Sequence, residues 1–338
     1  MRKEVEEAVK STFGTVFADK ISVARFQNNE WSPFKIQPMA PFEMHPATHC
    51  LHYGSTCFEG LKIHRWSDGT DHTFRLDRHI RRMQSSAQLL YLPVPEADLL
   101  ENMIVELVKE CRDWIPDHPG ALYVRPTLLG SLKSIGAAAA PSSEALLYIL
   151  LSPVGDYFSA GLKPLKLLLD DIHMRTSPDF GQAKTGGNYA SALHHIQEAK
   201  AQFGTDQVLF APGGDVQETG AANFLLINDK QIRTKKLDAS FLHGVTRDSI
   251  LKLGAQMGYE IIEDDITVGE VLEWTKTGEA ALSGTAAVLA GVGSLVYRGE
   301  VITFGSGEVG PNTMKLRNAL TSIQDGGSPD TFGWSRAI

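Results

Sequence analysis

Two segments with helical periodicity precede two strand-like segments in the first half of the chain, and this order limits the folds that it can adopt. Apolar residues recur at helical spacing over 76–90 and 97–114, whereas 121–129 and 145–151 have the composition of strands. The apolar run at 145–151 is far shorter than the ~20 residues that cross a bilayer, so we expect a buried strand. The first half is therefore predicted to be an α+β domain.

The length of 338 residues allows two domains of roughly 150 residues each. Residues 152–163 (SPVGDYFSAGLK) are rich in Pro, Gly and Ser and lie between two apolar strands, which is typical of an interdomain linker. We predict a small N-terminal α+β domain over 1–152, an interdomain loop over 153–163 and a large C-terminal α+β domain over 164–338.

The second domain contains the segment 207–229 (QVLFAPGGDVQETGAANFLLIND), which predicts two strands around a Pro-Gly-Gly-Asp turn. Helices are predicted over 189–203 and 246–257, and each is followed by a glycine that can end it.

The charge and the cysteines exclude several classes of function. The net charge is -8 and no Lys/Arg-rich block occurs, which argues against nucleic acid and anionic membranes as partners. Cys50, Cys57 and Cys111 form no CxxC pair, and the charged N-terminus lacks the apolar segment of a signal peptide. We therefore expect a cytoplasmic protein without a disulfide framework.

Lys184 and Glu218 are the first candidates for chemistry. Lys184 precedes a Gly-Gly-Asn turn and a helix (GQAKTGGNY), where small residues let the backbone approach a bound group, although most lysines are solvated surface charges. Glu218, in VQETGAANF, is predicted on a strand among small residues. Its carboxylate could keep a pyridinium nitrogen protonated, so that the ring acts as an electron sink. An ordinary hairpin salt bridge is the alternative.

Two further segments could bind a phosphate. In GVTRDSIL the backbone N–H groups of Val245 and Thr246 open a helix, and in SGTAAV the residues Ser283, Gly284 and Thr285 are predicted to form a small polar turn. The alternative for either segment is an ordinary helix cap or turn.

The motifs KTGGNY, ETGAANF, GVTR and SGTA, in this order and spacing, resemble the class IV aminotransferases, the fold-type IV pyridoxal-phosphate enzymes. The segments YGSTCFEGLKIHR, FRLDRHIRRM, LYVRPTLLGS and SPVGDYF are similar to the branched-chain amino acid aminotransferases in particular. The resemblance runs from about Trp31 to the C-terminus. It implies a two-domain α+β fold of the D-amino acid aminotransferase-like type and pyridoxal 5′-phosphate as cofactor.

The resemblance also implies roles for individual residues. Lys184 is the catalytic residue and forms a Schiff base with the cofactor, Glu218 pairs with the pyridine nitrogen, and Tyr189 hydrogen-bonds the phenolic O3′. The remaining cofactor contacts are to the phosphate, from Arg75, Val245, Thr246 and Thr285. Arginine suits a phosphate because its planar fork matches the oxygens. Without the resemblance, Arg75 would be interpreted as part of a solvated helix face.

For the substrate, the resemblance implies an apolar side-chain pocket and separate positions for two carboxylates. The apolar pocket consists of Tyr53, Phe58, Tyr157 and Tyr189, the α-carboxylate is received by Tyr123, Thr285 and Ala286, and the distal carboxylate of glutamate by Arg125. Aromatic walls suit leucine, isoleucine and valine. The alternatives are core packing for the aromatic residues and a buried structural role for Arg125.

The same resemblance predicts a homodimer, in which the loop with Ile135 and Ala137 enters the active site of the partner subunit. His45, His49 and His52 have spacing that could suggest a metal site, but no carboxylate or cysteine completes a known ligand pattern. We predict that no metal is used.

The expected reaction is ping-pong transamination of L-leucine, L-isoleucine and L-valine with 2-oxoglutarate through the Lys184 Schiff base. The products are branched-chain 2-oxo acids and L-glutamate. Other class IV chemistry is an alternative, namely D-amino acid or (R)-amine transamination or aminodeoxychorismate lysis. A non-catalytic cofactor-binding protein is a third possibility, and Glu218 argues against it because a carrier needs no electron sink.

Overall fold

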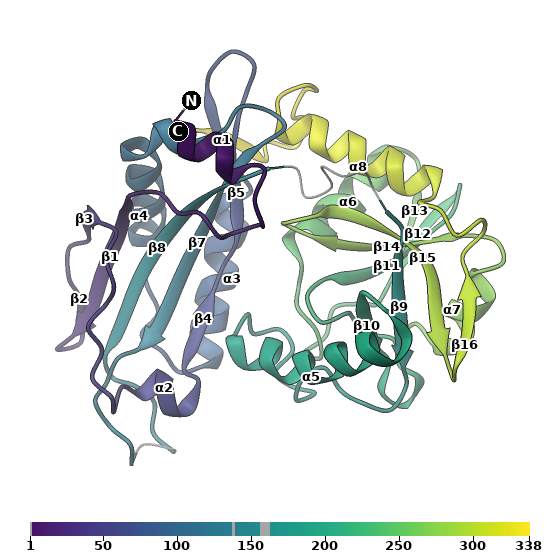
Figure 1. Cartoon of the computed structure of the whole chain (residues 1–338), viewed down its shortest axis with the longest axis horizontal. Coiled ribbons are helices and arrows are strands. Elements are labelled where there is room, and N and C mark those ends of the chain that lie inside the picture. Colours follow the sequence, from purple (N-terminus) through teal and green to yellow (C-terminus); the bar gives the residue numbers. More distant parts are fainter. Residues whose placement is uncertain (1, 137–138, 156–162) are drawn as a thin grey trace. The chain divides into compact units, whose positions relative to one another are not determined.

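The computed structural model describes residues 2–136, 139–155 and 163–338, and these form two compact units (Figure 1). The first unit contains the chain up to residue 155 together with 183–186 and 323–338, and the second contains 163–182 and 187–322. Two segments that the sequence analysis assigned to the C-terminal domain, 183–186 and 323–338, thus pack with the first unit. The division into domains over 1–152 and 164–338 therefore stays a prediction.

The described residues of the first unit form an antiparallel sheet and four α-helices. Its helices are α1 (Lys3–Ala8), α2 (His49–Tyr53), α3 (Leu76–Leu89), α4 (Ala97–Glu110) and the 3-10 helix η1 (Arg112–Trp114). Its strands are β1 (Lys20–Gln27), β2 (Glu30–Trp31), β3 (Lys35–Pro38), β4 (Thr56–Phe58), β5 (Leu61–Arg65), β6 (Asp71–Phe74), β7 (Ala121–Gly130), β8 (Ala145–Val154) and β17 (Ser335–Ala337). In the described chain they form one sheet in the order β17-β6-β5-β7-β8-β1-β2, with β3 on β1 and β4 on β7.

The predicted elements of the first half are confirmed. Strands β7 and β8 pair antiparallel along their whole length, from Ala121 opposite Val154 to Gly130 opposite Ala145. Helices α3 and α4 bury their apolar faces, including Met83 and Leu107, in the same core as the sheet residues. The segment predicted as helical over 97–114 divides into α4 and η1. Residues two apart on a strand point to the same face, so β7 presents Tyr123 and Arg125 together.

The second unit has a second sheet, in the order β10-β9-β15-β14-β11-β12-β13 with β16 on β15 among the described residues. Its strands are β9 (Leu165–Asp170), β10 (Gln207–Phe210), β11 (Asn223–Ile227), β12 (Gln231–Thr234), β13 (Glu260–Glu263), β14 (Glu279–Gly284), β15 (Val288–Tyr297) and β16 (Glu300–Thr303). Its helices are α5 (Gly186–Phe203), η2 (Pro212–Gly214), α6 (Val245–Gln256), α7 (Val268–Trp274) and α8 (Pro311–Gln324). None of the described helices combines the length and the apolar composition needed to cross a membrane.

The Pro-Gly-Gly-Asp turn is present, but the strand predicted after it is not. Gly213 and Gly214 take positive φ angles of 64° and 92°, which glycine adopts without steric cost. Beyond the turn, Glu218 and Thr219 form only isolated bridges, because the chain reverses again where Thr219 hydrogen-bonds Ala222. The prediction that Glu218 lies on a strand is therefore wrong. The next strand, β11, pairs with β12 and β14.

Candidate active site

Lys184 belongs to the first unit, and its backbone is fixed there on both sides. Its N–H donates to Ser86 Oγ on α3 at 3.0 Å, and its carbonyl accepts from the N–H of Phe58 on β4 at 3.0 Å. The next residue, Thr185, donates its hydroxyl to the carbonyl of Thr56 at 2.7 Å. Because this backbone is already fixed, a contact between the lysine side chain and a ligand costs side-chain entropy but little further backbone entropy.

Aromatic and cationic side chains surround the lysine. Lys184 Nζ lies 5.0 Å from the centroid of the Phe58 ring, and the guanidinium carbon of Arg125 lies 4.7 Å from the same centroid. Arg125 donates to the hydroxyl of Tyr123 at 3.0 Å, while its Nε is buried without a hydrogen-bond partner among the described residues. The first unit thus brings together four predicted site residues, Lys184, Phe58, Tyr123 and Arg125.

Gly60 makes room for Tyr123. A Cβ at Gly60 would lie 1.8 Å from the Tyr123 hydroxyl oxygen, so any larger residue would displace the Tyr123 ring. The Tyr123 ring also meets Phe13 edge-on at 5.0 Å. Tyr53 donates its hydroxyl to the carbonyl of Ile135 and thus joins α2 to the predicted dimer loop of its own chain. Tyr157 and Ala137, the other predicted residues of this region, lie outside the described residues.

A buried ion-pair network next to Phe58 was not predicted. Glu59 accepts two hydrogen bonds from Arg82, at 2.6 and 2.9 Å, and one from His79 Nδ1 at 2.8 Å. Burial opposes ionisation, but the Arg82 charge and these hydrogen bonds hold the pKa of Glu59 well below its usual range. Burial lowers the pKa of His79, and the Lys184 charge acts in the same direction. The network ties α3 to the chain that positions Lys184.

Arg75 is buried, so the interpretation as a solvated helix face is excluded. The residue precedes α3, takes a left-handed φ of 52° and is only 4% exposed. Its N–H donates to the carbonyl of Trp334 at 2.7 Å, and its guanidinium carbon lies 5.0 Å from the Trp334 ring. Trp334 in turn stacks on Phe332 at 4.0 Å. The C-terminal segment therefore orients the arginine predicted to bind a phosphate.

Glu218 lies in the second unit and is 1% exposed. Its Oε1 accepts from the N–H of Leu242 at 2.9 Å and lies 2.8 Å from a guanidinium nitrogen of Arg175. Its Oε2 accepts from Asn223 Nδ2 at 3.0 Å. A carboxylate so far from solvent requires such compensation. The partner is therefore a buried arginine from a distant segment, and not a residue of the same hairpin.

Arg175 is a residue that the sequence analysis missed, because the surrounding HMRTSPDF gives no periodic signal of burial. The side chain is 1% exposed, and its Nε donates to the carbonyl of Gly220 at 3.3 Å. Its guanidinium carbon lies 5.6 Å from the ring of Tyr189 on α5. Arg175 thus links Glu218 with Tyr189, two residues predicted to contact the cofactor ring.

The start of α6 lies beside the same network. Asn223 Nδ2 also donates to the carbonyl of Leu242 at 2.7 Å, and a Cβ at Gly244 would lie 2.0 Å from Asn223 Oδ1. Gly244 is therefore required as the N-cap residue, and it offers no side chain to cap the helix. The N-terminal turn of α6, which begins with Val245 and Thr246, is consequently available to an anion.

The end of β14 supplies further polar groups. Ser283 lies opposite Asn223 in the β11–β14 pair, and its Oγ is buried without a hydrogen-bond partner in the described chain. Ser283 and Gly284 complete the strand, so the turn comprises Thr285 to Ala287 and not Ser283 to Thr285 as predicted. An uncapped helix start, an unsatisfied serine and a threonine in one unit form a donor set that fits a phosphate group.

The histidines that the sequence analysis considered as metal ligands, His45, His49 and His52, each form a hydrogen bond with another protein group. His49 bonds Ser55 Oγ at 2.7 Å, and His52 bonds the carbonyl of Pro46 at 2.8 Å. His45 accepts from the N–H of Ala47 at 3.1 Å.

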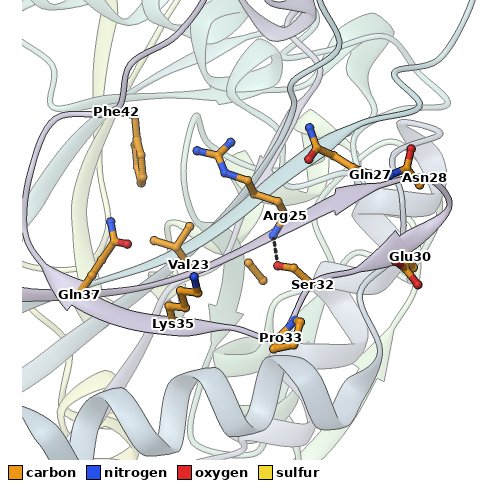
Figure 2. Close-up of a pocket in the computed structure, with 11 residues that line it drawn as sticks. Val23, Arg25, Gln27, Asn28, Glu30, Ser32, Pro33, Lys35, Gln37 and Phe42 are labelled. Atoms are coloured by element: carbon orange, nitrogen blue, oxygen red, sulfur yellow. Dashed lines mark hydrogen bonds between the residues drawn. The ribbon is translucent and has the colours of Figure 1, made fainter.

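A surface pocket of about 570 Å³ lies elsewhere in the first unit, between β1 and β3 (Figure 2). Arg25, Lys35 and Gln37 project toward it, and the N–H of Arg25 donates to Ser32 Oγ at 3.1 Å. None of the predicted site residues lines this pocket.

Comparison with known proteins defines the class of the chain. Residues 56–295 match the family model described as amino-transferase class IV, which covers more than half of the chain. Branched-chain-amino-acid aminotransferase 2 of Bacillus subtilis is 36% identical over 337 residues, 97% of this chain and 92% of that protein. A probable branched-chain-amino-acid aminotransferase of Streptomyces coelicolor is 35% identical, over 96% and 92% of the two chains.

The chain belongs to the branched-chain-amino-acid aminotransferases of class IV. The crystal structure of the branched-chain amino acid aminotransferase of Escherichia coli is similar, with a TM-score of 0.76 and 25% identity over 94% of this chain and 98% of that one. The predicted family and the two-domain fold-type IV architecture are confirmed. Pyridoxal 5′-phosphate is the cofactor of this class, and another similar structure is a branched-chain amino acid aminotransferase with pyridoxamine 5′-phosphate, with a TM-score of 0.77 and 25% identity.

Proposed function

We propose that the chain transfers the amino group of L-leucine, L-isoleucine and L-valine to 2-oxoglutarate, with pyridoxal 5′-phosphate as cofactor. The relatives named as branched-chain aminotransferases support the reaction class. The observation that carries the substrate assignment is the Phe58 ring, which contacts both Lys184 and Arg125. An aromatic surface suits a branched aliphatic side chain, and an adjacent guanidinium suits the distal carboxylate of glutamate.

When bound, the cofactor supplies an electron sink that stabilises negative charge at the substrate Cα. Lys184 holds it covalently, Glu218 faces the pyridine nitrogen, and Tyr189 donates to the phenolic oxygen. The phosphate is held by Arg75, Val245, Thr246 and Thr285. The buried ion pair between Glu218 and Arg175 supports the role of Glu218, because a nearby cation favours the charged form of a carboxylate that water does not reach.

Once its Nζ is free, Lys184 would serve as the base that removes the proton from the substrate Cα and would return a proton later in the reaction. Tyr53, Phe58, Tyr157 and Tyr189 surround the side chain. Tyr123 and the turn at Thr285 and Ala286 receive the α-carboxylate, while Arg125 accepts the second carboxylate of glutamate. Because the amino donor and the 2-oxo acid acceptor use one site in turn, the kinetics are ping-pong.

Absorption spectroscopy of the purified protein tests this proposal. L-leucine and L-glutamate, added separately, should each convert the cofactor band to that of the aminated form, and borohydride should attach the cofactor to Lys184. Conversion by D-alanine alone would instead assign the chain to D-amino acid transamination. A protein that binds the cofactor but reacts with no amino acid would be a carrier.

Substitution of Arg125 tests the dual specificity. Arg125→Met should slow the half-reaction with L-glutamate at least tenfold more than that with L-leucine, because only glutamate presents a second carboxylate. Arg25→Met, an exposed arginine on β1, is the matched control and should change neither. Stopped-flow measurement of each half-reaction separates the two substrates. An equal loss with both would assign Arg125 a structural role.

We further propose a cytoplasmic homodimer in which the loop with Ile135 and Ala137 completes the partner's site. Leu51 and Ile135, at 59% and 66% exposure, are large apolar residues that an isolated chain leaves in water. Ile135→Glu should convert a dimer into a less active monomer in analytical ultracentrifugation, whereas Ile172→Glu, another exposed isoleucine, should not. A wild-type monomer with full activity would contradict the dimer.

A further inference from the structure

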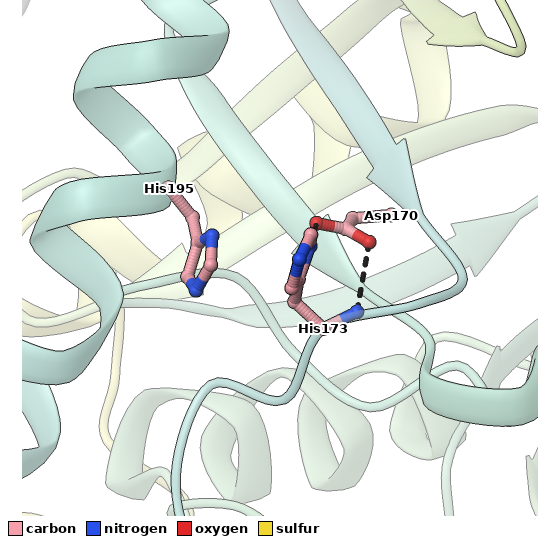
Figure 3. A group of neighbouring side chains, drawn as sticks. All are labelled: Asp170, His173 and His195. Atoms are coloured by element: carbon pink, nitrogen blue, oxygen red, sulfur yellow. Dashed lines mark hydrogen bonds and ion pairs between the residues drawn. The ribbon is translucent and has the colours of Figure 1, made fainter.

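A carboxylate and two imidazoles come together in the second unit, in residues to which the proposed function assigns no role. Asp170 is the last residue of β9, His173 follows it in the connecting loop, and His195 lies on α5. One potential ligand atom from each lies within 4.8 Å of the other two. Figure 3 shows the two rings facing one another, with the Asp170 carboxylate beside His173.

The carboxylate of Asp170 is held in place by the backbone. Its Oδ1 accepts from the N–H groups of Ile172 at 2.9 Å and His173 at 3.0 Å, which leaves Oδ2 directed at His173 Nδ1 at 2.8 Å. The Asp170 side chain is only 9% exposed, whereas that of His173 is 52% exposed. The cluster therefore has a fixed buried base and an opening toward solvent.

The two imidazoles are stacked and not hydrogen-bonded to one another. Their centroids are 4.3 Å apart and their planes differ by 27°. The neighbouring His194 takes a different partner, Glu198, at 3.2 Å. Rotation of two partly exposed rings about their side-chain torsions is inexpensive, so the nitrogens can approach one point while Asp170 stays fixed.

Against the sequence-based expectation that no metal is used, we propose that Asp170, His173 and His195 bind a divalent transition-metal ion, with Zn²⁺ as the favoured ion. Two imidazole nitrogens and one carboxylate oxygen are a ligand set that Zn²⁺ accepts at about 2.0–2.2 Å, with water in the fourth position. The ion replaces the Asp170–His173 hydrogen bond, and His173 binds it as a neutral imidazole through Nδ1 with its proton on Nε2. Mg²⁺ and Ca²⁺ are excluded as preferred ions, because they take oxygen ligands.

The location gives the ion a structural effect. His173 lies two residues before Arg175, whose guanidinium contacts Glu218, and His195 lies on the same helix as Tyr189. The bound ion joins the loop that leads to Arg175 to the helix α5 that carries Tyr189, and so restrains the Arg175–Tyr189 contact. Because it binds only the folded chain, it raises the stability of the second unit.

Zinc titration of the untagged holoenzyme tests the site. Metal is first removed with a chelator, and Zn²⁺ is then added in competition with a chromogenic indicator. We expect one Zn²⁺ per chain, and an affinity that falls about a hundredfold or more in His195→Gln, since even outer-shell changes cost ten- to a hundredfold. His194→Gln, one position along α5, is the matched control and should bind as the wild type does.

Two outcomes would overturn the proposal. Unchanged zinc binding in both His195→Gln and His173→Gln would show that the metal binds elsewhere. The cofactor, which every variant retains, would then be one candidate ligand. An equal loss in His194→Gln and His195→Gln would overturn the ligand set. The cofactor absorption of each variant verifies that it is folded, and a rise in the melting temperature with Zn²⁺, present in the wild type and absent in His195→Gln, gives a second readout.

Discussion

Each unit buries a glutamate that an arginine compensates, Glu59 with Arg82 in the first unit and Glu218 with Arg175 in the second. Such pairs add little stability compared with apolar residues of equal size, but removal of one partner leaves an isolated charge without water. We therefore interpret them as devices that hold a carboxylate in a defined place beside the residues of the active site.

Arg175→Met should destabilise the protein by about 3–5 kcal/mol, because Glu218 would remain buried without its cation. Urea unfolding followed by circular dichroism measures the change. Arg298→Met removes an exposed ion pair with Asp171 and should cost about 0–1 kcal/mol. Equal costs for the two variants would show that the Glu218–Arg175 pair is not compensating a buried charge.

At the scale of elements, the pairing of β5 with β6 holds a partly buried imidazole, that of His64. His64 lies opposite His72 in this antiparallel pair, and its Nε2 is buried without a hydrogen-bond partner among the described residues. Burial lowers the pKa of His64 to about 3, helped by the charge of Lys62. The folded chain therefore keeps this ring neutral over a pH range in which the unfolded chain protonates it.

His64→Leu should reduce the acid sensitivity of the protein. The folded pKa of about 3 lies below the ordinary value of 6.5, so stability is present above pH 6.5 and falls as the pH decreases toward 3. Between pH 7 and pH 5 the variant should lose up to about 2 kcal/mol less than the wild type. Urea unfolding at the two pH values measures this difference, and His52→Leu, an exposed ring, should behave as the wild type.

Helices and strands with a strong local pattern were predictable from the sequence. The ion pairs and hydrogen bonds of the candidate site residues were not. The helices α3 and α4 and the strands β7 and β8 follow from apolar repeats within each segment. Glu218 depends instead on Arg175 in a distant loop and on Leu242, which follows 24 residues later. No local periodicity encodes such long-range pairs, which is why Arg175 was missed and Glu218 was placed on a strand.

The same limit applies to the lysine. The order of the motifs predicts Lys184 as a site residue, but its backbone hydrogen bonds to Ser86 and Phe58 arise because two remote segments meet there. Gly186 and Gly187 begin α5, and a Cβ at Gly187 would meet no protein atom within 4 Å. That these glycines let the backbone approach a bound group stays a prediction.

For the whole molecule, the first unit is completed by the C-terminal segment. Strand β17 pairs antiparallel with β6, with Ser335 opposite Phe74, and Trp334 packs against Arg75. The last residues of the sequence thus add a strand to the sheet of the first unit and pack against Arg75.

Trp334→Ala should weaken cofactor binding between about twofold and thirtyfold, the range that corresponds to a lost cation–π contact of about 0.5–2 kcal/mol. Titration of the cofactor-free protein with pyridoxal 5′-phosphate, followed by absorption, measures the dissociation constant. Trp31→Ala removes a tryptophan that contacts Phe26 in the same sheet and should leave the constant unchanged. An unaltered constant in Trp334→Ala would separate Arg75 from the phosphate.

The path of the chain between its units has a consequence for protein engineering. Residues 183–186 and 323–338 pack with the first unit, although they follow the interval between 155 and 163 in sequence. A gene divided in that interval would give two fragments, of which the second carries the lysine segment and the final strand that the first requires. We expect neither fragment to fold alone. Co-expressed, they should reassemble into a coloured protein, so that pigment becomes a reporter of split-protein complementation.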